Sequence, residues 1–204
     1  MNSTNEGFFK RNTFLIKERV GVLKMSDTFD IIDPSTQQAI GLAREEISLF
    51  MKIMRMAFDK KQLPTTVCIY EGATLNEGSR PLFSLHRGFT VFRAKVALID
   101  DQGRTVATFR RKMLTIGCQF TILDANGQSL GMVKGDWKGW DFKVFDSKEQ
   151  PIGSVTKKWS GLGRELLTSA DSYVVDVSGE PSPDKVRWLL GAGLAIDTVF
   201  KEQD

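Results

Sequence analysis

Basic residues are the side chains of this sequence best suited to hold a ligand, and several of them stand beside tryptophans. They form three groups: Arg110, Arg111 and Lys112; Lys134 and Lys138, which flank Trp137 and precede Trp140; and Lys157 and Lys158, which precede Trp159. Cations alternating with tryptophan suit anionic lipid head groups, where each basic side chain contributes about 1 kcal/mol. The alternative is that the tryptophans pack on the fold and the cations lie on a solvated rim.

Residues for catalysis and for metal binding are scarce. Among 204 residues there is one histidine, His86, and there are two cysteines, Cys68 and Cys118. A site of three histidines is excluded, and the cysteines lack the CxxC spacing of a zinc-thiolate site. The segment GLGRE from Gly161 lacks the Lys-Ser/Thr of a phosphate-binding loop. We therefore expect a protein that is not an enzyme and has no metal site and no cofactor.

The overall charge and composition narrow the choice of partner and compartment. Lys and Arg number 28 against 25 Asp and Glu, and a net charge of +3 is small for a nucleic-acid-binding protein. Isolated cysteines suit a reducing compartment. There is no secretory signal over residues 1–19 and no run of about 20 apolar residues. We expect a cytoplasmic protein, peripheral on a membrane if it binds one, that forms a single domain over residues 1–204 with a loose segment over residues 1–9.

A repeated pattern predicts the fold that positions these residues. Four segments begin with the pattern apolar-x-apolar-apolar-Asp and continue through a polar turn to an aliphatic and then a small residue. Their aspartates are Asp33, Asp100, Asp124 and Asp146, and the last three lie 24 and 22 residues apart. This spacing fits two strands and two turns, in which the aspartate forms the turn, and it is too short for a βαβ unit. With the other β-rich segments we count ten to twelve strands, which indicates a closed barrel or a sandwich.

The C-terminal segment, from about Pro183 to Phe200, predicts a helix that is apolar on almost every side. Ser182 can cap it, and Pro183 suits the first helical position. A helix that is apolar all round must be buried all round, and in a protein of strands the inside of a barrel offers that environment. Gly191 and Gly193 cost helix propensity, which is tolerable where strands approach the helix closely.

A second helix is predicted near residues 45–59. Apolar residues recur there at helical spacing, with Glu45 and Glu46 at the start and Lys60 and Lys61 after the end, as the helix dipole favours. One interpretation is a helix that caps the barrel. The other is an interfacial helix with basic residues beside Phe and Met.

The C-terminal half resembles the phospholipid scramblase family. The resemblance rests on IGSVTKKWSGLGRELLTSADSY from Ile152 and KVRWLLGAGLAIDTVFKE from Lys185. The matching positions are Gly153, Lys158, Trp159, Gly161, Arg164, Glu165, Thr168, Ala170, Asp171, Leu190, Gly191, Ala192, Ile196, Asp197 and Phe200. The earlier hairpins are similar to LURP-one-related proteins, and the whole set of elements is similar to the tubby C-terminal superfamily.

The resemblance implies twelve antiparallel strands closed around a central hydrophobic helix, and contact with lipid. It implies either binding of anionic phospholipid or phosphoinositide head groups, or movement of phospholipids between leaflets. The chain departs from the family in lacking a Pro-rich N-terminal region and a Cys cluster. Its acidic segment, with Asp171, Asp176, Glu180 and Asp184, is too sparse to suggest a calcium site. A regulatory protein without a lipid role remains a further alternative.

Overall fold

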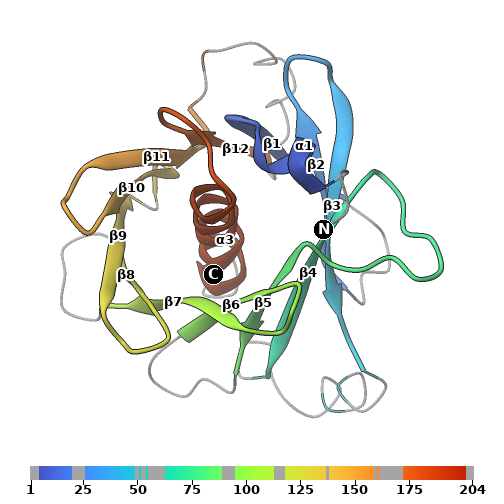
Figure 1. Ribbon diagram of the computed structural model, residues 1–204, viewed down its shortest axis with the longest axis horizontal. Coiled ribbons are helices and arrows are strands. Elements are labelled where there is room, and N and C mark those ends of the chain that lie inside the picture. The colour runs from blue at the N-terminus through green and yellow to red at the C-terminus, as the bar shows by residue number, and fades with distance from the viewer. Residues whose placement is uncertain are drawn as a thin grey trace.

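Twelve antiparallel strands form a closed barrel in the computed structural model, which describes residues 5–19, 26–48, 51, 54, 63–88, 95–112, 118–136, 138–158, 160 and 172–200. Each strand pairs with its neighbours in sequence, and β1 closes the barrel by pairing with β12 (Figure 1). This confirms the predicted barrel. The strands are β1 Thr13–Glu18, β2 Thr28–Asp33, β3 Gln38–Glu46, β4 Thr65–Glu71, β5 Phe83–Arg87, β6 Lys95–Asp100, β7 Thr105–Arg111, β8 Cys118–Leu123, β9 Ser129–Asp136, β10 Asp141–Asp146, β11 Pro151–Thr156 and β12 Ser172–Val177.

The four repeated aspartates are turn formers, as predicted. Oδ1 of Asp124 accepts hydrogen bonds from the backbone N–H groups of Asn126 (2.9 Å) and Gln128 (2.7 Å), and Asp100 and Asp146 repeat this pattern. Each hairpin also carries a register shift that the turn introduces. One residue in each turn has a positive φ: Gln37, Gly103, Gly127 and Glu149.

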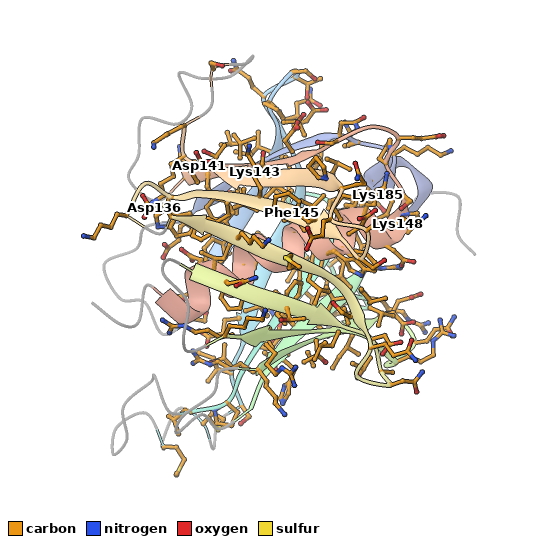
Figure 2. All side chains as sticks on the ribbon, turned by 90° about the vertical axis from the view of Figure 1, so that its left-hand side faces the viewer. Asp136, Asp141, Lys143, Phe145, Lys148 and Lys185 are labelled. Atoms are coloured by element: carbon orange, nitrogen blue, oxygen red, sulfur yellow. The ribbon has the colours of Figure 1, made fainter. Side chains whose placement is uncertain are left out.

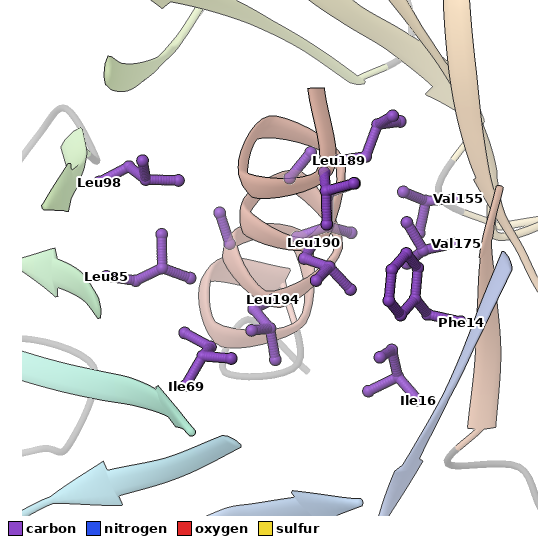
Figure 3. Close-up of a cluster of buried hydrophobic side chains, with 14 of the residues drawn as sticks. Phe14, Ile16, Ile69, Leu85, Leu98, Val155, Val175, Leu189, Leu190 and Leu194 are labelled. Carbon is purple, nitrogen blue, oxygen red and sulfur yellow. The ribbon is translucent and has the colours of Figure 1, made fainter. Parts of the chain in front are cut away.

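The helix α3 (Pro183–Phe200) runs through the middle of the barrel (Figure 1). Leu189, Leu190 and Leu194 are each 0% exposed and face strands on opposite sides of the barrel (Figure 3). A Cβ on Gly191 would lie 2.7 Å from Leu98 Cδ1, and one on Gly193 would lie 2.8 Å from Tyr173 Cε2. The strands therefore approach the helix closely at both glycines, as the sequence suggested.

The barrel has two different ends. The hairpin end carries the turns 34–37, 101–104, 124–128 and 147–150 and the start of α3. The rim end is the one at which β1, β3, β5, β7, β9 and β11 finish and toward which α3 runs. In Figure 2 the rim end lies on the left, where Asp136 and Asp141 are labelled. Because strand direction alternates, every odd-numbered strand delivers its last residues to the rim end.

Two predictions from sequence need correction. Residues 1–9 were expected to be loose, whereas Asn5–Phe9 forms the short helix α1, with Phe8 and Phe9 buried in the core. The second helix was predicted to begin at residue 45, which is too early. Glu45 and Glu46 are the last residues of strand β3 and pair with Val67 and Thr66 of β4. Glu45 is on the inward side of its strand and is 3% exposed. Residues 51 and 54 are helical, and the rest of the range 49–62 lies outside the described residues.

Candidate functional site

The basic residues singled out from sequence all come from the ends of odd-numbered strands or from the residues just after them. Arg110, Arg111 and Lys112 lie at the end of β7; Lys134 and Lys138 lie at and after the end of β9; Lys157 and Lys158 follow β11. The antiparallel topology therefore directs all seven to the rim-end half of the barrel. They do not form a single cluster, because β8 separates the β7 group from the rest.

The β7 group divides between the two faces of the barrel wall. Arg110 is exposed, points outward and lies opposite Lys95 of β6. Arg111 lies two residues after the buried Phe109 and therefore on the same, inward face of β7, and it is half-buried. Lys112 is exposed, and its backbone N–H donates to the Gln119 carbonyl at 2.9 Å. The group thus offers Arg110 and Lys112 to an external ligand, while Arg111 faces the interior.

Trp140 and Lys157 form the most closely packed part of the candidate site. The Lys157 Nζ lies 4.6 Å from the centroid of the Trp140 ring, within the range of a cation–π interaction. The ring also packs on Tyr173 and on the edge-on ring of Phe142, with centroid separations of 5.2 and 6.0 Å. Trp140 has a φ of 45°, which is an unusual backbone conformation for a bulky residue. Packing on three sides holds this residue in place at the rim end.

Lys138 and Lys158 lie around the same turn. The backbone N–H of Lys138 donates to Asp136 Oδ1 at 3.0 Å, and that of Lys158 donates to Thr156 Oγ1 at 2.9 Å. The position that a Cβ on Gly139 would take is 3.0 Å from Lys158 Nζ and 3.2 Å from Asp136 Oδ2. The Lys158 ammonium is therefore close to the 136–140 turn. We call Lys138, Trp140, Lys157 and Lys158 the tryptophan cluster.

Lys134 lies apart from this cluster, on the outer wall of the barrel. It is exposed, and its Nζ lies 5.5 Å from the centroid of the Phe145 ring. Its direct cross-strand neighbour is Lys143 of β10, which is also exposed. Sequence reasoning did not single out Lys143, since the pairing register that places it beside Lys134 is not evident from the spacing of lysines along the chain.

A layer of buried charged residues closes the inside of the barrel at the rim end. Glu18, Glu45, Arg87 and Asp197 are each less than 9% exposed, and the three on strands have inward parity near a strand end. The guanidinium of Arg87 donates to the Leu63 carbonyl at 3.3 Å and to Thr65 Oγ1 at 3.2 Å. This layer has a signal in the sequence. In each of these strands the alternate positions that face inward are apolar, and the last of them carries a charged residue.

Tyr173 is the largest polar side chain near this layer. It is 1% exposed, and its buried hydroxyl has no hydrogen-bond partner among the residues that the structure describes. Burial raises the pKa of Tyr173 well above its ordinary value, and the carboxylates of Asp197 and Glu18 raise it further. The phenol is therefore neutral throughout the physiological range and adds no charge to the site.

The described residues hold neither a cluster of metal ligands nor a helix that could span a membrane. Within the described residues, no three His, Cys, Asp or Glu side chains come together in a way that could hold a metal ion. Neither α1 nor α3, the helices described over their length, combines the length and apolarity needed to cross a bilayer.

Comparison with known proteins gives one match. The family model described as Scramblase matches residues 138–203, a segment that contains β10 to β12, α3 and the whole tryptophan cluster. No curated protein and no solved structure matches the chain. The closed barrel around α3 is consistent with the tubby-like superfamily. The segment 138–203 is thus similar to the Scramblase family, and the closed barrel around α3 is the fold that the resemblance implied.

Proposed function

We propose that the protein is a non-catalytic, cytoplasmic module that binds peripherally to membranes through the rim end of its barrel. The ligands are the head groups of anionic phospholipids or phosphoinositides. One observation carries the proposal: three odd-numbered strands direct cations to the same half of the barrel, and three of these lysines, Lys138, Lys157 and Lys158, lie in or beside the turn that carries Trp140, within the family-matched segment. Tryptophan and lysine together suit the membrane interface, where an amphipathic ring and a cation are both well solvated.

The expected binding is weak and depends on salt. Each lysine or arginine near an anionic surface contributes about 1 kcal/mol, and the attraction decays within a Debye length of roughly 8 Å at physiological ionic strength. Arg110, Lys112, Lys138 and Lys158 are exposed and can reach a surface directly. Lys157 can do so by leaving the Trp140 ring. Several such contacts give an affinity that low salt strengthens and high salt abolishes.

Flotation with vesicles tests this proposal. The full chain is mixed with phosphatidylcholine vesicles that contain phosphatidylserine or a phosphoinositide, at low and at physiological salt. The rim variant carries Lys138→Gln, Lys157→Gln and Lys158→Gln. The matched control carries Arg80→Gln, Lys148→Gln and Lys185→Gln near the hairpin end, which removes the same net charge.

We expect the wild type and the control to float with anionic vesicles at low salt, and the rim variant to stay at the bottom of the gradient. Absence of wild-type binding at low salt would refute the proposal and favour a regulatory protein without a lipid role. Equal losses in the two variants would show that net charge, rather than the rim end, governs binding.

Transbilayer movement of phospholipids is a second candidate function, favoured by the family match. The packing of α3 sets a physical condition on it. Leu189, Leu190 and Leu194 fill the barrel interior, so lipid could pass through the barrel only if the strands and the helix separated. A reconstituted assay with fluorescent lipid and dithionite, with and without calcium, tests this function. Unchanged dithionite protection in the presence of the protein would exclude it under those conditions.

A further inference from the structure

The outer wall formed by β9 and β10 carries two successive cross-strand pairs of like charge. Asp136 lies directly opposite Asp141, and both side chains are exposed at the rim end. Two residues further along the same face, the exposed Lys134 lies directly opposite the exposed Lys143. Figure 2 looks onto this wall and shows Asp136, Asp141 and Lys143 in that order away from the rim end, followed by Phe145. The wall thus has an acidic row and a basic row, which lie about 7 Å apart at two residues per step.

Neither row is neutralised by the strands around it. Like charges directly opposite each other on neighbouring strands are destabilising. In the described part of the chain, none of the four side chains takes part in an ion pair. The flanking strands add no charge at these levels, since Gln119 of β8 lies beside the basic row, and Ser154 and Thr156 of β11 lie beside the basic and the acidic row. Each row can therefore form ion pairs with charges that lie outside this copy of the chain.

A second copy of the same chain carries the complementary charges. In a symmetric dimer both subunits use the same patch, so that residue i contacts residue j while j contacts i. A two-fold axis parallel to the strands would place the acidic rows of the two copies on each other, and these would repel. A two-fold axis that runs across the strands, between the acidic and the basic row, places each acidic row on the basic row of the other copy. Charge complementarity therefore selects the second arrangement.

We propose that the chain forms a symmetric dimer through the wall of β9 and β10. Asp136 of each copy faces Lys134 of the other copy, and Asp141 faces Lys143, which gives four ion pairs across the interface. The rim ends of the two copies point in opposite directions, so that a dimer can place only one of them on a flat membrane. The interface uses none of the three lysines changed in the rim variant, and the proposal does not depend on membrane binding.

The size of the wall indicates a weak dimer. Next to the basic row, Met132 lies opposite Phe145, and this partly exposed pair adds a small apolar contact. Two strands over three rows nevertheless cover much less than the roughly 800 Å² that each partner buries in a standard interface. Exposed ion pairs are individually weak, and salt screens them. We therefore expect a dimer that forms at high protein concentration and low salt and dissociates at high salt.

Sedimentation equilibrium of the full chain over a range of protein concentrations, at low and at high salt, tests the dimer. One variant reverses the acidic row with Asp136→Lys and Asp141→Lys. Another reverses the basic row with Lys134→Glu and Lys143→Glu. The swapped variant carries all four changes, which keep the net charge of the wild type and restore the complementary order of the rows. Each variant is first checked for an unchanged spread of amide signals in its NMR spectrum.

We expect the wild type and the swapped variant to associate at low salt with similar strength. Each single-row variant should associate at least about tenfold more weakly, because four exposed ion pairs are replaced by repulsive contacts. The matched control carries Lys17→Glu and Lys95→Glu, two exposed positions on the β1 and β6 walls. It changes the net charge as much as reversal of the basic row does, and it should associate as the wild type does.

Three results would overturn the proposal. The first is a wild type that stays monomeric at low salt and millimolar concentration. The second is a single-row variant that associates as strongly as the wild type, or a control that loses association to the same extent as reversal of the basic row. The third is a folded swapped variant that does not associate. Failure of vesicle flotation would instead count against the rim end and leave the dimer standing.

Discussion

The ammonium of Lys157 lies 4.6 Å from the centroid of the Trp140 ring, and the backbone N–H of Lys157 donates to the Trp140 carbonyl at 3.0 Å. The end of β11 is therefore linked to the turn between β9 and β10 both through side chains and through the backbone. An exposed cation–π contact of this kind contributes only about 0.5–1 kcal/mol. An anionic surface can compete for the same ammonium at a similar energy.

Replacing Lys157 should therefore separate stability from membrane binding. Lys157→Met keeps the aliphatic contact with Trp140 and removes the charge. We expect the free energy of unfolding to fall by less than about 1 kcal/mol and vesicle binding to fall about fivefold, which corresponds to about 1 kcal/mol. Urea unfolding and flotation measure the two effects, with Lys157→Arg as the control that should preserve both. A large loss of stability without a change in flotation would make Lys157 a structural residue.

Tyr173→Phe should stabilise the protein. The Tyr173 hydroxyl is fully buried and finds no hydrogen-bond partner in the described part of the chain, and such a group costs about 1–3 kcal/mol of desolvation. Phenylalanine keeps the contacts with Trp140 and with the space left by Gly193, so we expect the free energy of unfolding to rise by about 1 kcal/mol. Urea denaturation monitored by circular dichroism checks this. A decrease would mean that the hydroxyl is hydrogen-bonded in solution.

The hairpin turns offer a matched pair of substitutions. Glu149 has a φ of 60° at the turn position where the preceding repeat has Gly127 with a φ of 81°. A left-handed conformation costs a non-glycine residue about 1–2 kcal/mol, and glycine gives back roughly 0.5–1 kcal/mol in unfolded-state entropy. Glu149→Gly should therefore stabilise by about 0.5 kcal/mol, and Gly127→Ala should destabilise by about 1 kcal/mol. Opposite signs in equilibrium unfolding would contradict the assigned turn geometry.

Much of the fold could be predicted from sequence because it rests on local patterns. One pattern is the aspartate whose side chain accepts hydrogen bonds from the backbone N–H groups two and four residues further on, which marks each hairpin turn. The other is the C-terminal helix, which is apolar on all sides and therefore has to be enclosed. The start of the second helix was wrong because Glu45 and Glu46 look like an acidic first turn. In the structure the pairing of β3 with β4 outweighs that local preference.

The candidate site was less predictable because it depends on register and on which face a strand presents. Spacing along the chain indicated lysines near tryptophans, and the topology directs them to one half of the barrel. The inward parity of Arg111 and the position of Lys143 opposite Lys134 depend on the closed barrel and its register. The role of the cations in binding head groups stays a prediction.

Acid should weaken the turn between β6 and β7 through Asp100. Burial alone would raise the pKa of this carboxyl, but hydrogen bonds from Arg104 and Gln102 lower it more, so its pKa lies below the ordinary 3.8. A lowered folded-state pKa gives stability that is fully present above the unfolded value and is lost as the pH falls through the folded value. We expect the stability difference between the wild type and Asp100→Asn to be constant near neutral pH and to shrink below about pH 4. Unfolding curves measured across that range check the sign, and a difference that grows in acid would contradict it.

Hydrogen–deuterium exchange of the wild-type chain with and without anionic vesicles tests most directly whether the rim end faces the membrane. We predict slower exchange on vesicles for amides at residues 110–112, 138–140 and 157–158, and unchanged exchange in the hairpin turns at 101–104, 124–128 and 147–150. High salt should remove the protection. Protection confined to the hairpin turns, or no change at any amide of a chain that floats with the vesicles, would contradict the account.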